Sequence, residues 1–278
     1  MSSSDWRPIS RVGLPALREA RAQAHYAAQW LARAAYAYIP SKPDYSHSNL
    51  GWEDAFDGFA THPLKDGVRL GVKLADLSLA LLDTKGAARA QFKLGGRTDT
   101  DARAWLDPQM AALGLVAAKL DTPPDYPMPE HAIGKGAAYS AASGEALSAL
   151  AAWFANADRV LGRVPYAAQA SPVRCWPHHF DLATLITLPD QGAKTGRSVN
   201  AGLSPGDHYY DEPYYYISPW PYPDAKKLPP VPKLGHWHTR EFTAAVAPAS
   251  RILAAKNPQA ETEQFLREAV DGLVKALE

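Results

Sequence analysis

The sequence predicts an α+β fold of two pseudo-repeats, each with a helix, antiparallel strands and a second helix, packed as one two-lobed unit. Two observations predict this fold. In each half, a segment with apolar residues at helical spacing is followed by segments in which apolar and polar residues alternate, and then by a second segment with helical spacing. The motif Trp-x-x-x-Phe-Asp follows the first helix of both halves, at 52–57 and 176–181. Such a repeat indicates related sheets covered by helices.

The first half begins with a long helix at residues 14–39, whose apolar residues recur at spacings of three and four until Pro40 ends it. Alternation over 68–74 predicts a half-buried strand. The alternation changes parity at 75–76, which indicates a tight hairpin or, as the alternative, a bulge. The other elements expected here are strands over 77–81 and 88–94 and a helix over 99–113 with Gly114 as its C-cap.

A Pro-rich stretch at 120–142 is the predicted boundary between the halves. We assign an N-terminal repeat to 1–120, a connector to 121–143 and a C-terminal repeat to 144–278. The elements expected in the C-terminal repeat are a helix over 144–161, strands over 173–188, 197–203 and 214–219, and a helix over 261–277. Because each half alone has few strands, a shared core is expected rather than two independent domains.

Composition and charge exclude several classes of function. The 29 basic and 29 acidic residues balance, and no basic stripe indicates a nucleic-acid partner. No N-terminal signal pattern is present, and no apolar stretch reaches the ~18 residues that cross a bilayer. We therefore expect a cytoplasmic protein with no membrane partner. The single cysteine, Cys175, excludes an internal disulfide and a thiolate zinc cluster, and its apolar surroundings favour a buried thiol over a nucleophile.

Histidines distinguish the second motif from the first. His178 and His179 stand where the first copy has an aspartate and an alanine. The residues that both copies share are expected to serve the fold, so the two histidines are the better site candidates. If 176–182 forms one strand, His179 and Asp181 share a face and His178 points the other way.

A second histidine pair, His236 and His238, flanks a tryptophan. On a strand this spacing points two imidazoles to one face, near enough to share a metal ion. With one carboxylate and an open position, zinc, manganese or iron held there would activate water or polarise a carbonyl. The candidates for a third ligand are His179, Asp181, His208 and Glu212. The alternative is a structural network of histidines and tyrosines that holds the Pro-rich loops.

We expect one pocket in the C-terminal half and no matching pocket in the N-terminal half. Aromatic residues between 209 and 222 supply walls for a flat or sugar-like ligand, and the turn at 202–207 brings the backbone close. The expected catalytic residues are Glu212 and His179, the expected metal ligands are His236, His238 and His179, and the expected ligand-binding residues are His178, Asp207, His208, Tyr209, Tyr214, Tyr216 and Trp237.

Four motifs in the second half are distinctive. They are Trp176-Pro-His-His-Phe-Asp-Leu-Ala, Ser204-Pro-Gly-Asp, Glu212-Pro-Tyr-Tyr-Tyr-Ile-Ser-Pro-Trp-Pro and Gly235-His-Trp-His-Thr. With them the chain resembles an uncharacterised bacterial family, a domain of unknown function, strongly in the second half and weakly in the first. The resemblance implies a bacterial cytosolic protein. It implies no activity and no catalytic residues.

Three functions remain open at this stage. The first is a metal-dependent, hydrolase-like enzyme that acts on a small molecule through the histidine- and tyrosine-rich pocket. The second is a non-catalytic small-molecule-binding protein with an aromatic pocket. The third is a structural or interaction protein, which an exposed apolar patch without a pocket would favour. Convergence of the nitrogens of His179, His236 and His238 would favour catalysis over binding.

Overall fold

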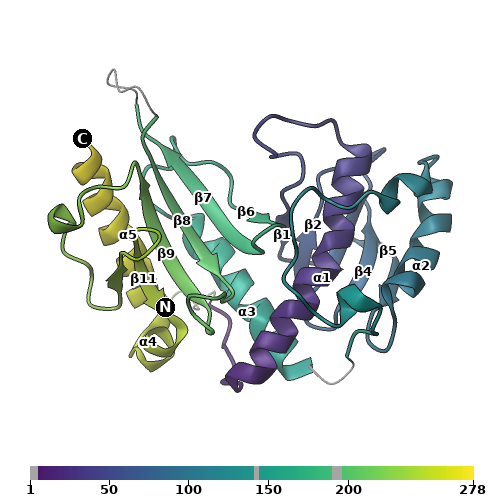
Figure 1. Ribbon diagram of the computed structural model, residues 1–278, viewed down its shortest axis with the longest axis horizontal. Coiled ribbons are helices and arrows are strands. Elements are labelled where there is room, and N and C mark those ends of the chain that lie inside the picture. The colour runs from purple at the N-terminus through teal and green to yellow at the C-terminus, as the bar shows by residue number, and fades with distance from the viewer. Residues whose placement is uncertain (1–5, 141–143, 190–195) are drawn as a thin grey trace. The chain divides into compact units, whose positions relative to one another are not determined.

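The computed structural model describes residues 6–140, 144–189 and 196–278 (Figure 1). These residues form helices and two antiparallel sheets, one of five strands and one of six. The predicted α+β class is therefore confirmed. The chain divides into two compact units. The first unit contains residues 10–152 and 175–180, and the second contains the residues up to Ile9 together with 153–174 and 181–278.

The sheet of the first unit is a meander in which each strand pairs with the next. Its strands are β1 (Gly51–Glu53), β2 (Gly58–Ala60), β3 (Arg69–Lys73), β4 (Ser78–Leu82) and β5 (Ala88–Lys93). The predicted hairpin at 75–76 is confirmed, because β3 pairs antiparallel with β4 and the N–H of Leu77 donates to the carbonyl of Leu74 at 3.2 Å. The sequence did not reveal β1 and β2, since strands of three residues are too short to show a period.

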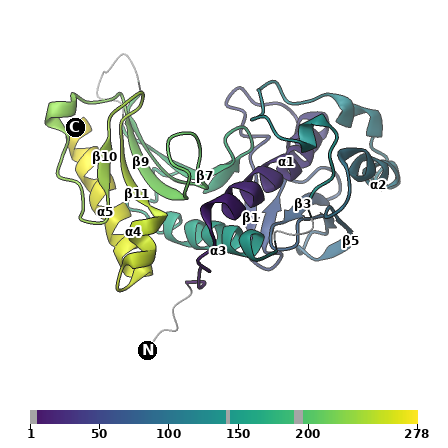
Figure 2. The ribbon, with the colours of Figure 1, turned by 60° about the horizontal axis from the view of Figure 1, so that its bottom comes forward.

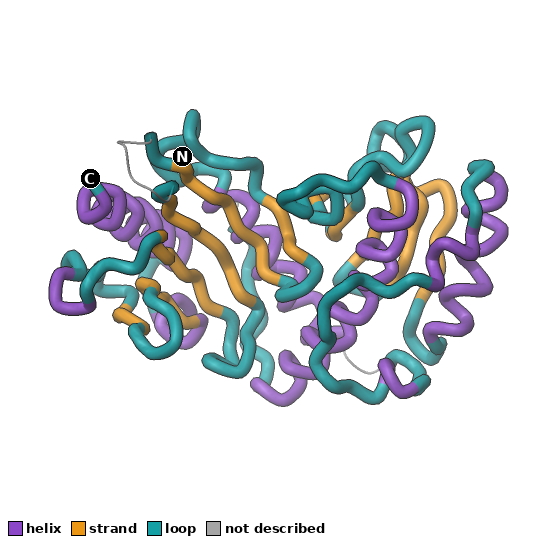
Figure 3. The backbone as a smooth tube through the Cα atoms, turned by 45° about the horizontal axis from the view of Figure 1, so that its top comes forward, coloured by secondary structure: helices purple, strands orange, loops and turns teal. Residues whose placement is uncertain are grey.

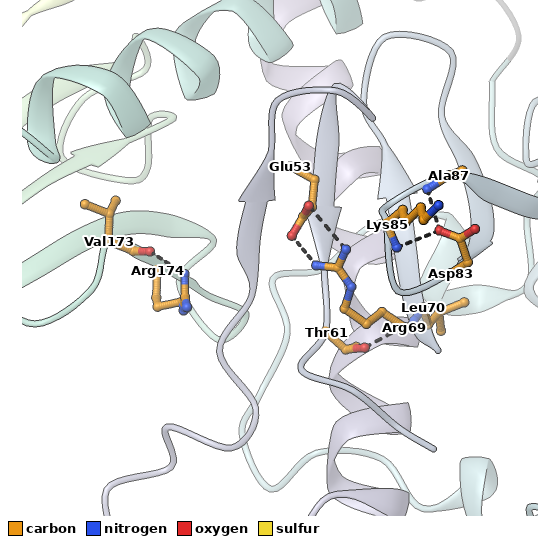
Figure 4. A network of polar contacts seen from close by, with 9 residues as sticks. All are labelled: Glu53, Thr61, Arg69, Leu70, Asp83, Lys85, Ala87, Val173 and Arg174. Atoms are coloured by element: carbon orange, nitrogen blue, oxygen red, sulfur yellow. Dashed lines mark hydrogen bonds and ion pairs between the residues drawn. The ribbon is translucent and has the colours of Figure 1, made fainter. Parts of the chain in front are cut away.

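Polar contacts tie the turns of this sheet to its strands (Figure 4). The guanidinium of Arg69 on β3 forms an ion pair with Glu53 at the end of β1. Both side chains are partly exposed, so we expect the pair to contribute at most about 1 kcal/mol. In the β4–β5 hairpin, the carboxylate of Asp83 accepts the N–H groups of Lys85 at 2.8 Å and Ala87 at 3.0 Å. These bonds form an Asx turn, which sets the path of the hairpin.

The helices of the first unit follow the predicted apolar stripes. They are α1 (Leu14–Tyr38), α2 (Asp99–Ala112) and the short 3-10 helices η1 (Ala117–Asp121) and η2 (Ile133–Lys135). The α1 helix packs against β3, and small residues of the helix such as Ala24 are fully buried. A capping box of Thr98 and Asp101 starts α2. At its other end the C-cap is Leu113 rather than the predicted Gly114, which follows the cap and adopts a left-handed φ of 65°.

The six-stranded sheet has the order β10-β11-β9-β8-β7-β6. Its strands are β6 (Arg174–Trp176), β7 (Asp181–Thr187), β8 (Ser198–Ser204), β9 (Tyr214–Trp220), β10 (His236–His238) and β11 (Ala244–Pro248). They belong to the second unit except for residues 175–176 of β6, which are assigned to the first. Strands are drawn in orange in Figure 3. The sequence did not reveal β11, because all of its residues are buried and no alternation is present.

One long helix covers the sheet of the second unit. The α5 helix (Pro258–Leu277) packs against β8, β9 and β11, as Figure 2 shows for β9 and β11. Its apolar stripe, which includes Phe265 and Leu273, is buried as the sequence predicted. The other helices are α3 (Gly144–Leu161), which has residues in both units, α4 (Ala249–Ala254) and the 3-10 helix η3 (Ala225–Lys227).

The prediction of one continuous strand over 173–188 is wrong. The segment forms two strands, β6 and β7, separated by a turn at residues 177–180. Within the turn Phe180 adopts a left-handed φ of 58°, which lies outside the strand region and interrupts the extended backbone. His179 and Asp181 therefore do not share a strand face.

The predicted duplication is not confirmed, because the two Trp-x-x-x-Phe-Asp motifs form similar hairpins that are one residue out of step. In the first hairpin the N–H of Asp57 donates to the carbonyl of Glu53 at 2.8 Å, and φ at Asp57 is 59°. In the second, the N–H of Phe180 donates to the carbonyl of Trp176 at 2.7 Å. Asp57 and Phe180 therefore occupy the same position in their hairpins. The sequence motif instead aligns Phe56 with Phe180. The shared letters correspond to a shared kind of turn.

Candidate functional site

The turn at 177–180 is held on both sides by buried contacts of the first unit. Its last residue, Phe180, is 1% exposed and packs edge-on against Phe59 of β2, with ring centroids 6.0 Å apart. On its N-terminal side, Cys175 is fully buried and exchanges two backbone hydrogen bonds with Leu50, at 2.8 and 2.9 Å. The prediction that Cys175 is a buried thiol is therefore confirmed.

Two polar side chains of α1 bind the turn directly. His25 donates from Nε2 to the carbonyl of Pro177 at 2.7 Å, and Gln29 donates to the same oxygen at 3.0 Å. The ring of His25 also stacks on Phe180, with centroids 5.2 Å apart and planes 7° from parallel. Burial lowers the pKa of His25 to about 4, so the ring is neutral at neutral pH. The turn is thus attached to a rigid helix.

A cavity of about 390 Å³ lies beside this turn within the first unit. Its volume falls in the range of roughly 300–1,000 Å³ that is typical of small-molecule sites. Four aromatic side chains and two carboxylates are among the groups that line it. The lining residues are Tyr36, Asp44, Tyr45, Ser48, Asp125, Tyr126, Trp176, Pro177 and His178.

Hydrogen bonds fix the side chains at the two ends of the cavity wall. The hydroxyl of Tyr126 donates to Oε1 of Gln29 at 2.8 Å, so the glutamine that binds the turn also positions this tyrosine. The hydroxyl of Tyr36, on α1, donates to Oδ1 of Asp125 at 3.1 Å. Burial and the Asp125 carboxylate raise the pKa of Tyr36, which therefore remains a neutral donor at physiological pH.

The loop after α1 supplies the remaining wall. His47 is 3% exposed, accepts the backbone N–H of Lys42 at Nδ1 (3.2 Å), and contacts the rings of Tyr36 and Tyr45. Tyr45 adopts a left-handed φ of 57° and is 49% exposed. The side chain of Asp44 accepts the N–H of Ser46 at 3.1 Å, and this bond lowers the pKa of the carboxyl group. The loop therefore presents an ionised carboxylate and an aromatic ring.

A second cavity, of about 270 Å³, shares Tyr126 with the first. Trp30 and Arg33 of α1 also line it. The guanidinium of Arg33 lies 5.3 Å from the centroid of the Trp30 ring and donates to the carbonyl of Leu120 at 3.2 Å. Both cavities involve residues of the N-terminal half, whereas the sequence predicted one pocket in the C-terminal half and no matching pocket in the N-terminal half.

The histidine pair of the second unit forms a directional hydrogen-bond chain. His236 and His238 lie on one face of β10, as predicted, and both contact the hydroxyl of Tyr210 at 3.0 Å. His238 must donate from Nε2 to the carbonyl of Arg240 at 2.6 Å, so in the neutral ring Nδ1 accepts the Tyr210 hydroxyl. The Tyr210 oxygen then accepts Nε2–H of His236. Burial lowers the pKa of His236, and the nearby Arg251 and His238 lower it further.

Asp207 organises the aromatic residues next to this chain. Its Oδ1 accepts the N–H groups of Tyr209 at 2.8 Å and Tyr210 at 3.2 Å, and its Oδ2 accepts the hydroxyl of Tyr214 at 2.5 Å. Burial and the bonded carboxylate raise the pKa of Tyr214. By binding the backbone N–H of Tyr210, Asp207 holds this tyrosine where its hydroxyl contacts both His236 and His238.

A family model described as a family of unknown function, DUF5996, matches residues 10–276. The chain belongs to this family. The predicted resemblance to a domain of unknown function is confirmed, and the match covers both halves of this DUF5996 chain. No curated protein and no solved structure matches it. No described helix of this family member is long and apolar enough to cross a membrane.

Several residues predicted as site residues have structural contacts in this DUF5996 chain. Glu212 accepts the backbone N–H and the hydroxyl of Ser250 at 2.5 and 2.9 Å, in the first turn of α4. The indole N–H of Trp237 donates to the carbonyl of Pro229 at 2.9 Å, which attaches the Pro-rich loop to β10. The ring of His208 lies 3.8 Å from that of Tyr209.

Tyr216 on β9 pairs with Gly202 on β8, where a Cβ atom would lie 2.6 Å from the tyrosine hydroxyl. A glycine is therefore required to leave room for the ring. The Tyr216 hydroxyl donates to the carboxylate of Asp181, and burial and this carboxylate raise its pKa.

The predicted metal ligands belong to different units. His179 lies in the first unit, on the exposed side of the turn, and the pair His236 and His238 lies in the second. Among the residues that the structure describes, no group of three or more histidine, cysteine, aspartate or glutamate side chains is arranged to hold a metal ion.

Sequence reasoning missed most of the first-unit cavity and the central tyrosine of the histidine chain. It assigned only His178 of the cavity lining to a ligand. The missed residues are Tyr36, Asp44, Tyr45, Asp125, Tyr126 and Tyr210. Tyrosine and aspartate recur beside prolines at 43–45 and 124–126, and this is the signal that could have drawn attention to the two loops.

Proposed function

We propose that this chain binds a small organic molecule in the first-unit cavity lined by Trp176 and His178. The observation that carries the proposal is the preformed aromatic cavity of about 390 Å³. A site of this size, with aromatic walls and a few oriented polar groups, has the composition of a small-molecule pocket.

The rigidity of the walls supports the proposal. The turn at 177–180 is bound by His25 and Gln29 of one helix, and Gln29 also holds Tyr126. A wall ordered before the ligand arrives reduces the entropy lost on binding.

A matched pair of tyrosine variants tests the proposal. Tyr45 lines the cavity and is 49% exposed, whereas Tyr222 lies in the second unit and is 46% exposed. A mixed panel of small amines, carboxylates, sugars and neutral aromatics is titrated by ligand-observed NMR. We expect compounds that bind the chain to lose about tenfold in affinity with Tyr45→Ala and to be unchanged with Tyr222→Ala. Absence of any Tyr45-dependent binding would refute the proposal.

A metal-dependent hydrolase is the other function that the sequence predicts, and it stays a prediction. His236 and His238 could supply two nitrogen ligands only if Tyr210 gave up the bonds that it makes to both rings. Elemental analysis of protein purified without a metal-affinity tag tests this function. We expect about one equivalent of zinc, manganese or iron per chain if it is correct, and a substoichiometric content excludes it.

A further inference from the structure

The charged groups of the first-unit cavity indicate the chemical class of its ligand. Asp44 and Asp125 both line it, and among the described residues no lysine or arginine side chain does. The pKa of Asp44 is lowered by the N–H of Ser46, so this carboxylate is ionised at neutral pH. The carboxyl group of Asp125 accepts a hydrogen bond from the hydroxyl of Tyr36 at 3.1 Å. The lining therefore favours positive charge.

The aromatic walls favour positive charge as well. Tyr36, Tyr45, Tyr126 and Trp176 line the same cavity as the two carboxylates. The faces of these rings are the negative side of their quadrupoles, and a desolvated organic cation is attracted to them. A carboxylate ligand would meet repulsion from both the aspartates and the ring faces.

The cationic side chains of Arg33 and Lys42 lie outside this lining. Arg33 borders the neighbouring cavity, where its guanidinium lies over Trp30 and binds the carbonyl of Leu120. Lys42 lowers the pKa of Asp44 through its charge, but it is exposed and is not a lining residue. No lysine or arginine of the lining therefore competes with a ligand cation for the carboxylates of Asp44 and Asp125.

We infer that the ligand of this cavity is an organic cation, a substituted ammonium group held by ring faces and the carboxylates of Asp44 and Asp125. This inference rests on the proposed function, since it names the ligand class of the same site. A neutral sugar is the main competing occupant, because aromatic faces and carboxylates also suit hydroxyl groups.

The experiment compares choline with 3,3-dimethylbutanol, its neutral isostere, and with methyl glucoside and acetate, by NMR titration of the full chain. We expect choline to bind about tenfold or more tightly than the neutral isostere, because the two differ in charge and hardly in shape. Asp125→Asn and Asp44→Asn should each weaken choline binding several-fold and leave the isostere unchanged. Asp66→Asn is the control, since Asp66 is also exposed, lies in the same unit and does not line the cavity.

Each outcome decides between the inference and the proposed function. Equal binding of choline and its isostere, or choline binding that neither aspartate substitution weakens, overturns the cation inference. If methyl glucoside or acetate binds instead, and Tyr45→Ala abolishes that binding, the inference is overturned and the proposed function stands. If no compound shows binding that depends on Tyr45, both are overturned.

Discussion

The buried ring of His25 makes the stability of the protein depend on pH. Its pKa falls from an ordinary value of 6.5 to about 4, mainly because burial disfavours the charged ring. The charges of His179, Arg21 and His178 lower it further, while the bond to Pro177 raises it. Between these two values the unfolded chain binds a proton that the folded chain does not. Stability is therefore fully present above pH 6.5 and is lost as the pH falls towards 4.

The size of this effect follows from the two pKa values. One pKa unit corresponds to about 1.4 kcal/mol, so the difference amounts to about 3 kcal/mol when the pH reaches 4. About 2 kcal/mol of this should already be lost between roughly pH 7.5 and pH 5. That is a large fraction of the 5–15 kcal/mol that is typical of a domain, taken as an order of magnitude.

Urea denaturation at a series of pH values measures the effect. The His25→Gln variant removes the ionisable ring, and we expect its free energy of unfolding to fall by about 2 kcal/mol less than that of the wild type over this pH range. It should also be less stable at neutral pH by about 1–3 kcal/mol, because the buried bond to Pro177 is weakened.

The control is His208→Gln, because His208 is exposed. This variant should keep the pH dependence of the wild type. If His25→Gln showed the same pH dependence as the wild type, the ring would be solvated or charged in the folded state, and the account of how α1 holds the turn would be wrong.

Two further predictions concern tyrosine hydroxyls of the second unit. Tyr215 is fully buried, and its hydroxyl has no hydrogen-bond partner among the described residues. Tyr215→Phe should therefore leave the free energy of unfolding, measured by thermal denaturation, unchanged or raise it by up to about 1 kcal/mol. A clear loss of stability would show that the hydroxyl has a partner. Tyr210→Phe should cost about 1–2 kcal/mol in urea denaturation, because both His236 and His238 lose a hydrogen bond. Tyr209→Phe is its control, since the hydroxyl of Tyr209 binds Glu241 at the exposed surface. Equal losses of stability in the two variants would show that the hydrogen bonds from Tyr210 to the two histidines contribute no more than an exposed one.

The sequence alone was sufficient for the elements that have a long period. The apolar stripes at helical spacing predicted α1 and α5 close to their observed ends, because a period of 3.6 repeated over many residues is produced by a helix and hardly ever by a strand or loop. The spacing of His236 and His238 also predicted correctly that the two rings share a face of a short strand. Local geometry determines both results, so no knowledge of distant residues was needed.

The turn at 177–180 shows where local reasoning fails. The residues from Arg174 to Leu182 have the composition of a strand, and no residue among them predicts that Phe180 adopts a left-handed φ. The conformation is stabilised by distant groups, namely the ring of Phe59 and the side chains of His25 and Gln29. Tertiary packing thus overrides the local preference. As a result His178 lies in the cavity wall and His179 is an exposed residue of the turn, and neither lies in a strand.

The candidate site itself was decided only by the tertiary structure. Its walls come from the end of α1, the loop at 41–48, the Pro-rich stretch at 125–126 and the turn beside Trp176. These segments are far apart in the chain, and a single sequence contains no signal for which of them meet. The residues that carry the chemistry could be recognised as a class, since tyrosine, histidine and aspartate gather near the prolines. Which of them face one cavity depends on how α1 packs on its sheet and holds the turn, because a hydrogen bond such as that of His25 to Pro177 forms only once both elements are in place.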